Sequence, residues 1–248
     1  MKIIALYSIK GGVGKTASAV NLSYIAAREG ASTLLCDLDP QGSASYYFRI
    51  RPSKKFNRKK FLKGGKVIDK NIKGTDYLNL DMLPADFSYR NLDVALDDLK
   101  RSRTRLKQIF KPYNGEYEYI FLDCPPNITL VSENVFFAAD CLIVPCIPTT
   151  LSILTFEKLV RFFKDKRLAR GKIQPFFSMV EKRKKMHRDI IRQVPDKKKY
   201  NFLTSQIPYT ADIEKMGLTR EPVVSFKPKS KAAKAYEKLW QEIKKRAL

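Results

Sequence analysis

Three short patterns in the first half of the chain carry residue types that bind phosphate groups and a divalent cation. The first is a glycine-rich loop with two lysines and a threonine, formed by Lys10, Gly11, Gly12, Val13, Gly14, Lys15 and Thr16. Glycines let successive backbone N–H groups turn toward one anion, and the start of a following helix adds partial positive charge. At this spacing the Lys15 ammonium reaches the β- and γ-phosphates of a nucleotide, and the Thr16 hydroxyl faces Mg²⁺. The loop therefore predicts binding of ATP with Mg²⁺.

The surroundings of this loop favour a phosphate-binding role over an ordinary basic turn. An apolar, strand-like run at residues 2–7 precedes it and a helical pattern at residues 16–29 follows it, which is the order that a phosphate loop requires. The generic pattern GxxxxGK[ST] places a glycine at position 9, where this chain has Ile9 followed by Lys10. The loop is therefore a variant of the common motif, distinguished by its second lysine.

The other two patterns are carboxylates at the ends of apolar runs. Asp37 and Asp39 follow the run that ends at Cys36, and Asp123 follows four residues that begin at Tyr119. Groups at the carboxyl ends of parallel strands line the ligand site of an α/β sheet. An aspartate there can hold the hydration shell of Mg²⁺, which makes Asp123 the candidate magnesium acid. Strand ends often carry Asp, so each pattern alone is a weak signal, but three in this order are a strong one.

Apolar runs that read as buried strands recur along the chain. They cover residues 2–7, 33–37, 78–83, 118–123, 141–146, 173–180 and 202–207, and the segments between them are mostly helical in periodicity. This alternation predicts an α/β fold of the P-loop NTPase type, with a mostly parallel twisted sheet and helices on both faces. A length of 248 residues with 44% hydrophobic content is most simply read as one domain over residues 1–248.

Helical spacing predicts helices over residues 16–29, 91–110 and 151–168, and Gly30 lies where a helix C-cap is expected. A segment at about 49–75 has few periodic apolar positions and reads as an irregular, partly mobile insertion. Its lysines suit a second DNA contact, a partner-binding loop or a solubilising surface, and the sequence does not rank the first two.

These residues together resemble the ParA/MinD family of ATPases. The deviant phosphate loop of that family has the form KGGVGKT, which residues 10–16 match without a mismatch, and residues 37–42 and 123–126 look like its two switch motifs. The resemblance continues at lower specificity to the C-terminus, through Pro208 and the segment at 221–223. It implies an ATPase that forms an ATP-sandwich dimer and turns over slowly until a partner stimulates it.

The resemblance also implies a role for each matching residue. Lys10 would contact the nucleotide of the partner subunit, Asp39 would orient the attacking water near the magnesium with support from Asp37, and Asp123 would bind magnesium through water. Phosphoryl transfer asks for positioning and charge neutralisation, which agrees with these roles. The implied nucleotide-binding set is Lys10, Gly11, Gly12, Val13, Gly14, Lys15, Thr16, Ala17, Met179 and Pro208.

Two departures from the family pattern concern recognition of the base. Family members often place an Asn near the end of the strand at 173–180, where this chain has Ser178 and Met179. The loop after Pro208 also lacks the basic residue and Ser-Glu-Ala-Pro that many chromosomal ParA proteins carry there. The departures indicate a divergent branch with a cargo of its own, and leave open how adenine is read.

The net charge of +23 favours a polyanionic partner, with nucleic acid first and anionic membrane second. The charge is concentrated in blocks: residues 49–73 hold eleven basic residues against one acidic, 161–199 fifteen against four, and 227–246 eight against two. Non-specific DNA affinity rests on Lys and Arg that neutralise phosphates. The candidate DNA-binding residues, weighed against a merely solvated charged face, are Lys182, Arg183, Lys184, Lys185, Arg188, Arg192, Lys197, Lys198 and Lys199.

The last twenty residues could serve either of two purposes. Ala232, Tyr236, Leu239, Trp240 and Ile243 recur at helical spacing, which suits a helix packed on the domain and also an amphipathic membrane helix like that of MinD. We favour packing on the domain, because the Ala-rich start suits close docking and no disordered linker follows residue 231.

The sequence therefore predicts a cytoplasmic, nucleoid-associated ParA-type ATPase. It has no apolar stretch of membrane-spanning length and no signal-peptide layout at its start. We expect a homodimer with ATP and Mg²⁺ that binds DNA without sequence preference and positions a plasmid, chromosome region or protein assembly through a ParB-like or other adaptor. The alternatives are a MinD-like membrane ATPase and a reductase or metal-cluster carrier on the same scaffold. The second is disfavoured because the four cysteines lack CxxC spacing and read as core residues.

Overall fold

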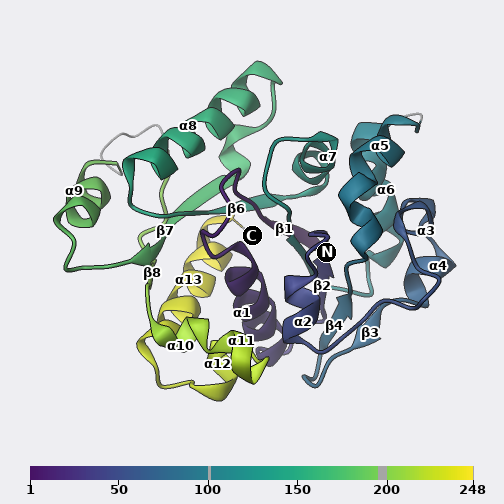
Figure 1. Cartoon of the computed structure of the whole chain (residues 1–248), viewed down its shortest axis with the longest axis horizontal. Coiled ribbons are helices and arrows are strands. Elements are labelled where there is room, and N and C mark those ends of the chain that lie inside the picture. Colours follow the sequence, from purple (N-terminus) through teal and green to yellow (C-terminus); the bar gives the residue numbers. More distant parts are fainter. Residues whose placement is uncertain (100–101, 195–199, 248) are drawn as a thin grey trace.

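The computed structural model describes residues 1–99, 102–194 and 200–247, which form an eight-stranded sheet with helices on both sides (Figure 1). The sheet order is β3-β4-β2-β5-β1-β6-β7-β8. All neighbouring strands are parallel except the β3/β4 pair at one edge, which is antiparallel. The strands are β1 (Lys2–Leu6), β2 (Thr33–Asp37), β3 (Lys73–Gly74), β4 (Leu80–Leu83), β5 (Tyr119–Asp123), β6 (Cys141–Cys146), β7 (Ile173–Val180) and β8 (Gln206–Pro208). The predicted fold class is confirmed.

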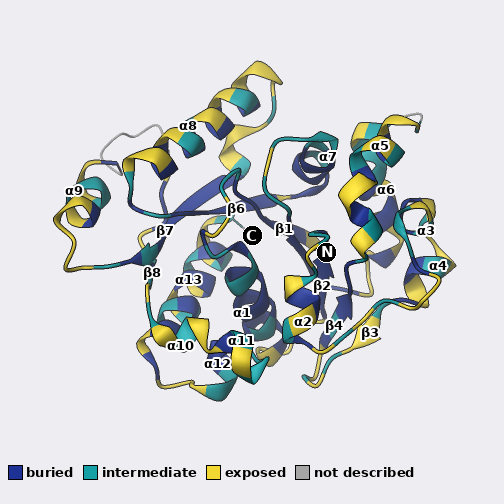
Figure 2. Cartoon of the chain, viewed as in Figure 1, coloured by how far each residue is buried: buried dark blue, intermediate teal, exposed yellow. Residues whose placement is uncertain are grey.

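Alternate residues of each strand feed two separate hydrophobic clusters, one on each face of the sheet. In β1, Ile3 and Ala5 belong to one cluster, whereas Ile4 and Leu6 belong to the other. Because both faces are covered, the strands are dark blue along most of their length in Figure 2 and read as continuous apolar runs in the sequence.

The helices divide between these two faces. Those packed with the Ile4 and Leu6 side are α1 (Lys15–Arg28), α2 (Ser43–Tyr47), α10 (Ala211–Glu214), α11 (Met216–Thr219), α12 (Val223–Phe226) and α13 (Lys231–Ala247). Those on the other side are α3 (Arg58–Lys63), α4 (Lys66–Asp69), α5 (Leu92–Asp97), α6 (Arg105–Phe110), α7 (Leu130–Ala138), α8 (Thr150–Asp165) and α9 (Lys185–Gln193). Short 3-10 turns lie at Phe87–Asn91, Ser102–Thr104, Lys111–Tyr113 and Arg170–Lys172.

The predicted helix over residues 16–29, with Gly30 beyond its end, and the predicted burial of the cysteines are both confirmed. The helix begins one residue before the predicted start, and Gly30 follows its end with φ +99°, a left-handed conformation that glycine adopts without a steric cost. All four cysteines are buried and unpaired, as expected of small core side chains.

The run at 202–207 is a strand only from Gln206 onward. Phe202 stacks on Phe177, with ring centroids 4.6 Å apart, and the Leu203 N–H donates to the Pro175 carbonyl. These side chains are buried without joining the β7/β8 ladder, and an apolar run does not distinguish that kind of burial from a strand. The predicted strand over 202–207 is therefore wrong for residues 202–205.

The predicted helix over 91–110 is also wrong as a single element, because the described part of this segment forms α5 and α6 with a 3-10 turn before α6. The Leu106 N–H donates to the side-chain oxygen of Asn134 on α7, so that it is satisfied by a neighbouring helix. Arg105 donates to the carbonyls of Leu62 and Lys63, which ties α6 to α3. Tertiary contacts thus replace the continuous helical ladder that the periodicity suggested.

The segment at 49–75 is not irregular as predicted. It contains α3 and α4 and ends in β3, and Phe56, Phe61, Leu62 and Ile68 are buried in the core beneath them. The Asn57 side chain caps α3 by accepting from the Lys60 N–H at 3.1 Å. Because the apolar residues are few and unevenly spaced, the sequence pattern did not reveal this packing.

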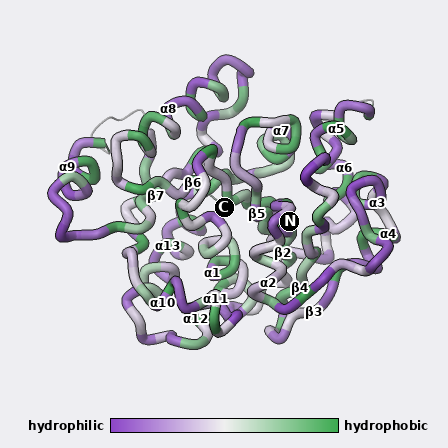
Figure 3. Tube along the Cα trace, in the orientation of Figure 1, coloured by the Kyte–Doolittle hydropathy of each residue, from purple (hydrophilic) through white to green (hydrophobic). Residues whose placement is uncertain are grey.

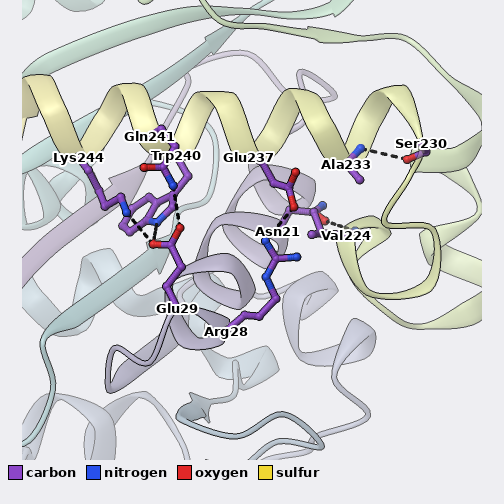
Figure 4. A network of polar contacts seen from close by, with 10 residues as sticks. All are labelled: Asn21, Arg28, Glu29, Val224, Ser230, Ala233, Glu237, Trp240, Gln241 and Lys244. Atoms are coloured by element: carbon purple, nitrogen blue, oxygen red, sulfur yellow. Dashed lines mark hydrogen bonds and ion pairs between the residues drawn. The ribbon is translucent and has the colours of Figure 1, made fainter.

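The C-terminal helix α13 is docked on the domain. Leu239 and Trp240 are fully buried, and the Trp240 indole N–H donates to Glu29 at 2.8 Å (Figure 4). Gln241 and Lys244 donate to the same carboxylate, both at 2.7 Å. Although burial raises the pKa of Glu29, these three hydrogen bonds bring it below its usual value. The predicted docking is confirmed, and no helix within the described ranges is long and apolar enough to cross a membrane.

Candidate nucleotide-binding site

The strand order brings the three sequence patterns to one edge of the sheet. Strand β5 lies between β1 and β2, and Asp123 at its end is in register with Leu6 of β1 and with Asp37 of β2. The loop that follows β1, the aspartates that follow β2 and the aspartate that ends β5 are therefore neighbours. The Leu38 N–H donates to the Asp123 carbonyl at 2.9 Å, which extends the β2/β5 contact past the strand ends.

The glycine-rich loop takes a conformation that requires glycine at two positions. Gly12 has φ +68° and Gly14, which precedes the first turn of α1, has φ +89°. A Cβ atom on Gly14 would lie 3.0 Å from the Oγ atom of Ser178, so this glycine also permits the close approach of β7. Gly11 and Gly12 are exposed, whereas Val13 is fully buried and anchors the loop in the domain. The exposed backbone ahead of α1 forms an anion cradle of the kind that phosphate loops use.

The side chain of Lys15 lies under this cradle. It is 8% exposed, and its Nζ atom donates to the Lys10 carbonyl at 3.4 Å. Burial lowers the pKa of Lys15, while the nearby charges of Asp123 and Asp39 oppose that shift. No carboxylate of a described residue lies within ion-pair distance of its ammonium, so its charge is available to a phosphate.

Asp37 is fully buried and holds the loop after β2 in place through hydrogen bonds. Its carboxylate accepts from the Ser45 N–H at 2.9 Å, from the Ser45 hydroxyl at 2.7 Å and from the Asp39 N–H at 3.1 Å. Burial raises the pKa of Asp37 to about 6 even though these hydrogen bonds favour the ionised form. Its contacts position Asp39, which is half-buried and accepts from the Gln41 N–H at 3.0 Å.

Asp123 is fully buried, and neither of its carboxylate oxygens has a hydrogen-bond partner among the described residues. Burial, followed by the charge of Asp37, raises its pKa well above the usual value, while the neighbouring Thr16 hydroxyl and Lys15 ammonium lower it. An orphaned buried carboxylate is costly unless something binds it. A hydrated Mg²⁺ between Thr16 and Asp123 fits these residues, because Mg²⁺ keeps several waters and takes few protein ligands. In the described part of the chain no cluster of three or more Asp, Glu, His or Cys side chains offers an all-protein metal cage.

A small cavity of about 60 Å³ opens beside the loop and brings together residues of α1, β7, β8, α10 and α13 and of the loops before α1 and after β8. Its walls include four predicted nucleotide contacts, Gly14, Ala17, Met179 and Pro208. Met179 has φ +54°, an uncommon conformation for a residue with a side chain, and such strain concentrates at functional sites. Ser178 and four residues of the loop after Pro208, which are Tyr209, Thr210, Ile213 and Glu214, also line it and belong to the two segments that the sequence analysis linked to the base. The walls that the sequence prediction missed are Ile207 on β8 and Tyr236 on α13.

A larger groove of about 890 Å³ lies along β8 between the loop after β7 and α13. It contains two predicted DNA-binding residues, Lys182 and Arg183, and three exposed lysines of α13 that the prediction did not include, Lys231, Lys234 and Lys238. The spacing of these lysines places them on one side of the helix. We call these five residues the basic groove.

The other predicted DNA-binding residues divide into three groups. Arg188 and Arg192 lie on α9 and line a second, smaller cavity next to Lys182, and Arg188 also donates to the Lys182 and Arg183 carbonyls. Lys185 is exposed, whereas Lys184 is paired with Glu181. The last three, Lys197, Lys198 and Lys199, lie outside the described residues.

The sequence of the chain matches a known family and several known proteins. A family model described as an AAA domain matches residues 1–174. The chromosome partitioning protein ParA of Caulobacter vibrioides is 28% identical over 254 residues, which cover 98% of this chain and 94% of that protein. The chromosome-partitioning ATPase Soj of Treponema pallidum is 30% identical over 98% of this chain and 96% of its own length.

A similar solved structure is that of a putative plasmid partition protein from Borrelia burgdorferi bound to AMPPNP. It superposes with a TM-score of 0.82 at 24% identity and covers 98% of both chains. At this level of identity the likeness concerns the fold.

Proposed function

The chain belongs to the ParA/MinD family of P-loop ATPases, and we propose that it forms an ATP-sandwich dimer that binds DNA without sequence preference and positions a cargo. The cargo is a plasmid, a chromosome region or a protein assembly, reached through a ParB-like or other adaptor that stimulates hydrolysis. The relatives named for chromosome partitioning support this proposal.

The hydrolysis site is proposed to use the residues gathered at the ends of β1, β2 and β5. ATP phosphates would lie on the loop from Lys10 to Thr16, with the buried Lys15 ammonium neutralising their charge. Mg²⁺ would be held by the Thr16 hydroxyl and, through water, by Asp123, and it would neutralise charge on the phosphates. Asp39, which Asp37 holds in place, would orient the attacking water.

The proposed dimer and the proposed slow basal rate of ATP hydrolysis both concern the phosphate loop. The loop carries Lys10 half-buried at its exposed end, beside Gly11 and Gly12, where a second subunit could approach it. We propose that Lys10 contacts the nucleotide of that second subunit. A site completed only by a second chain and an adaptor turns over slowly by itself, because the transition-state charge is incompletely neutralised.

The observation that carries the DNA part of the proposal is a wall shared by two cavities. Pro208, Tyr209 and Thr210 line both the small cavity beside the phosphate loop and the basic groove. A nucleotide base bound in the small cavity would therefore contact the same segment that lines the basic groove. This is a physical route by which ATP can change the affinity of the groove for a phosphate backbone, and it supports nucleoid association in the ATP state.

The membrane-binding alternative is not supported by the C-terminal helix. The large apolar residues of α13, which are Tyr236, Leu239, Trp240 and Ile243, are buried against the domain, and the exposed residues of the helix are polar. Membrane insertion would require this helix to leave the core.

The experiment that tests the proposal measures binding to a random-sequence duplex and to anionic liposomes, each with ATP, ADP or no nucleotide and across a salt series. We expect ATP to strengthen duplex binding, with high salt weakening it and liposomes binding little. A variant with Lys231→Gln, Lys234→Gln and Lys238→Gln should lose the ATP-dependent increment. The matched control removes three charges from exposed residues of α8, Lys158→Gln, Arg161→Gln and Lys164→Gln, and should keep it.

Two site variants separate binding from hydrolysis. Lys15→Ala should abolish ATP binding or turnover, whereas Asp39→Ala should leave an ATP-held dimer that hydrolyses poorly. Full hydrolysis in both variants would contradict the assigned roles, and ATP-dependent liposome binding without duplex binding would contradict the DNA proposal.

A further inference from the structure

A second cluster of positive charge lies at the opposite edge of the sheet from the basic groove. We call residues 51–73 the lysine lobe; it contains α3 and α4 and lies next to β3 and β4 (Figure 1). Figure 3 shows the chain trace largely purple over these two helices. Phe56, Phe61, Leu62 and Ile68 of the lobe are buried in the core, and Val67 and Ile72 pack partly buried against it, so the lysines lie on a packed surface and not on a free tail.

The exposed surface of the lysine lobe is almost entirely basic. Eleven of its residues are exposed, and apart from Ser53, Gly65 and Asp69 they are Arg51, Lys54, Lys55, Lys59, Lys63, Lys66, Lys70 and Lys73. Among the described residues, no carboxylate lies within ion-pair distance of any of these eight side chains. The one acidic residue of the lobe, Asp69, accepts a hydrogen bond from Tyr113 at 2.6 Å. The positive charge of these eight side chains is therefore not neutralised by ion pairs with other described residues.

The chemistry of this surface fits the backbone of a nucleic-acid duplex better than it fits another protein. Protein interfaces are enriched in aromatic residues, Met and Arg and are depleted in Lys. Sites for single strands need exposed aromatic rings for base stacking. The lobe has no exposed apolar or aromatic side chain, since Phe56 and Phe61 are buried. Its exposed lysines are point charges, which bind phosphates without reading sequence.

The lysine lobe and the basic groove are separate surfaces. They lie at the two ends of an eight-stranded sheet, and seven strand spacings of ~4.8 Å put them roughly 34 Å apart. The groove shares Pro208, Tyr209 and Thr210 with the nucleotide cavity, whereas no residue of the lobe lines that cavity. We propose that the lysine lobe is a second duplex-binding surface that contacts DNA phosphates whether or not nucleotide is bound.

The test compares the full chain with a lobe variant that carries Lys59→Gln, Lys63→Gln and Lys66→Gln. Binding to a random-sequence duplex is measured without nucleotide and with ATP, from low to moderate salt. Without nucleotide, the lobe variant should bind at least about tenfold more weakly, and the slope of log K against log salt should fall by about 2.7, which is ~0.9 for each phosphate that a lysine no longer neutralises. The ATP-dependent increment and the ATPase rate should stay as in the parent protein.

The α8 variant described above removes the same number of charges and serves as the control. Equal nucleotide-free affinity and equal salt slopes for the lobe and α8 variants would overturn the proposal, as would the absence of nucleotide-free duplex binding by the parent chain at low salt. Capture of polyglutamate in place of the duplex would also overturn it, because the lobe would then be a surface for an acidic protein. The variant with Lys231→Gln, Lys234→Gln and Lys238→Gln tests the proposed function separately, because it concerns the ATP-dependent increment in duplex binding. Failure of the proposed function is therefore distinguishable from failure of the proposal for the lysine lobe.

Discussion

Replacing Asp123 with Asn should stabilise the nucleotide-free protein while removing most of its ATPase activity. The carboxylate is fully buried, has no hydrogen-bond partner among the described residues and is in register with the buried Asp37. The change to Asn keeps the volume of the side chain and removes its charge. We expect the free energy of unfolding at pH 8 to rise by about 2 kcal/mol, because an ionised carboxylate without partners costs more to bury than a neutral amide in the same place. Hydrolysis should fall by about 10- to 100-fold, the usual effect of losing a residue that acts on a metal through water.

The pH dependence of this gain provides a sharper test than its size. Burial and the charge of Asp37 hold the pKa of Asp123 well above its usual 3.8, so the folded state favours the protonated carboxyl. The stability that this group contributes is therefore fully present below pH 3.8 and is lost as the pH rises through the folded-state pKa. Asn does not titrate. The difference in stability between Asp123→Asn and the parent should consequently be small in acid and grow toward pH 8.

Urea denaturation from about pH 3.5 to about pH 8, without nucleotide or Mg²⁺, measures this difference. Asp97→Asn is the matched control, because Asp97 is exposed on α5 and its loss of charge should change stability by less than about 0.5 kcal/mol at every pH. A gain that does not vary with pH, or a loss of stability at pH 8, would refute the view that the buried carboxylate is maintained at a cost to the fold.

Three further outcomes are expected from the structure. Trp240→Ala should lower the free energy of unfolding by about 3–5 kcal/mol in urea denaturation, whereas Leu218→Ala, at an 84% exposed position, should change it little. Gly14→Ala should weaken ATP binding by at least about tenfold in calorimetric titration, and adding Ser178→Gly should restore it only in part, because the positive φ remains strained. Glu242→Gln should lower the free energy of unfolding by about 1 kcal/mol at pH 7, because the Glu242 carboxylate accepts three hydrogen bonds. Although burial raises the pKa of Glu242, these hydrogen bonds bring it below its usual value. The difference in stability between the variant and the parent should therefore vanish as the pH falls through the folded-state pKa.

The local chemistry of the site could be predicted because it is encoded in contiguous residues. A phosphate loop needs a strand, a glycine run and a helix in immediate succession, and residues 2–29 contain all three. Asp37 and Asp123 could be found because each ends a fully apolar run, and the alternation of such runs with helical segments determined the fold class. The docking of α13 could also be predicted, although its apolar periodicity suits a membrane helix equally well, because its start is rich in Ala and no disordered linker precedes it.

What the tertiary structure decided is which distant residues meet. Hydrophobic periodicity shows that a residue is buried, but it does not show against what. The place of Tyr236 in the wall of the small cavity beside Gly14 and the packed lysine lobe over Phe61 therefore had no local signal. The sequence likewise shows the basic residues only as blocks along the chain, because it does not show which blocks lie side by side in space. Folding places Lys182 and Lys234 in one groove and the lysine lobe at the far edge of the sheet, because strand order is set by long-range pairing and not by order along the chain.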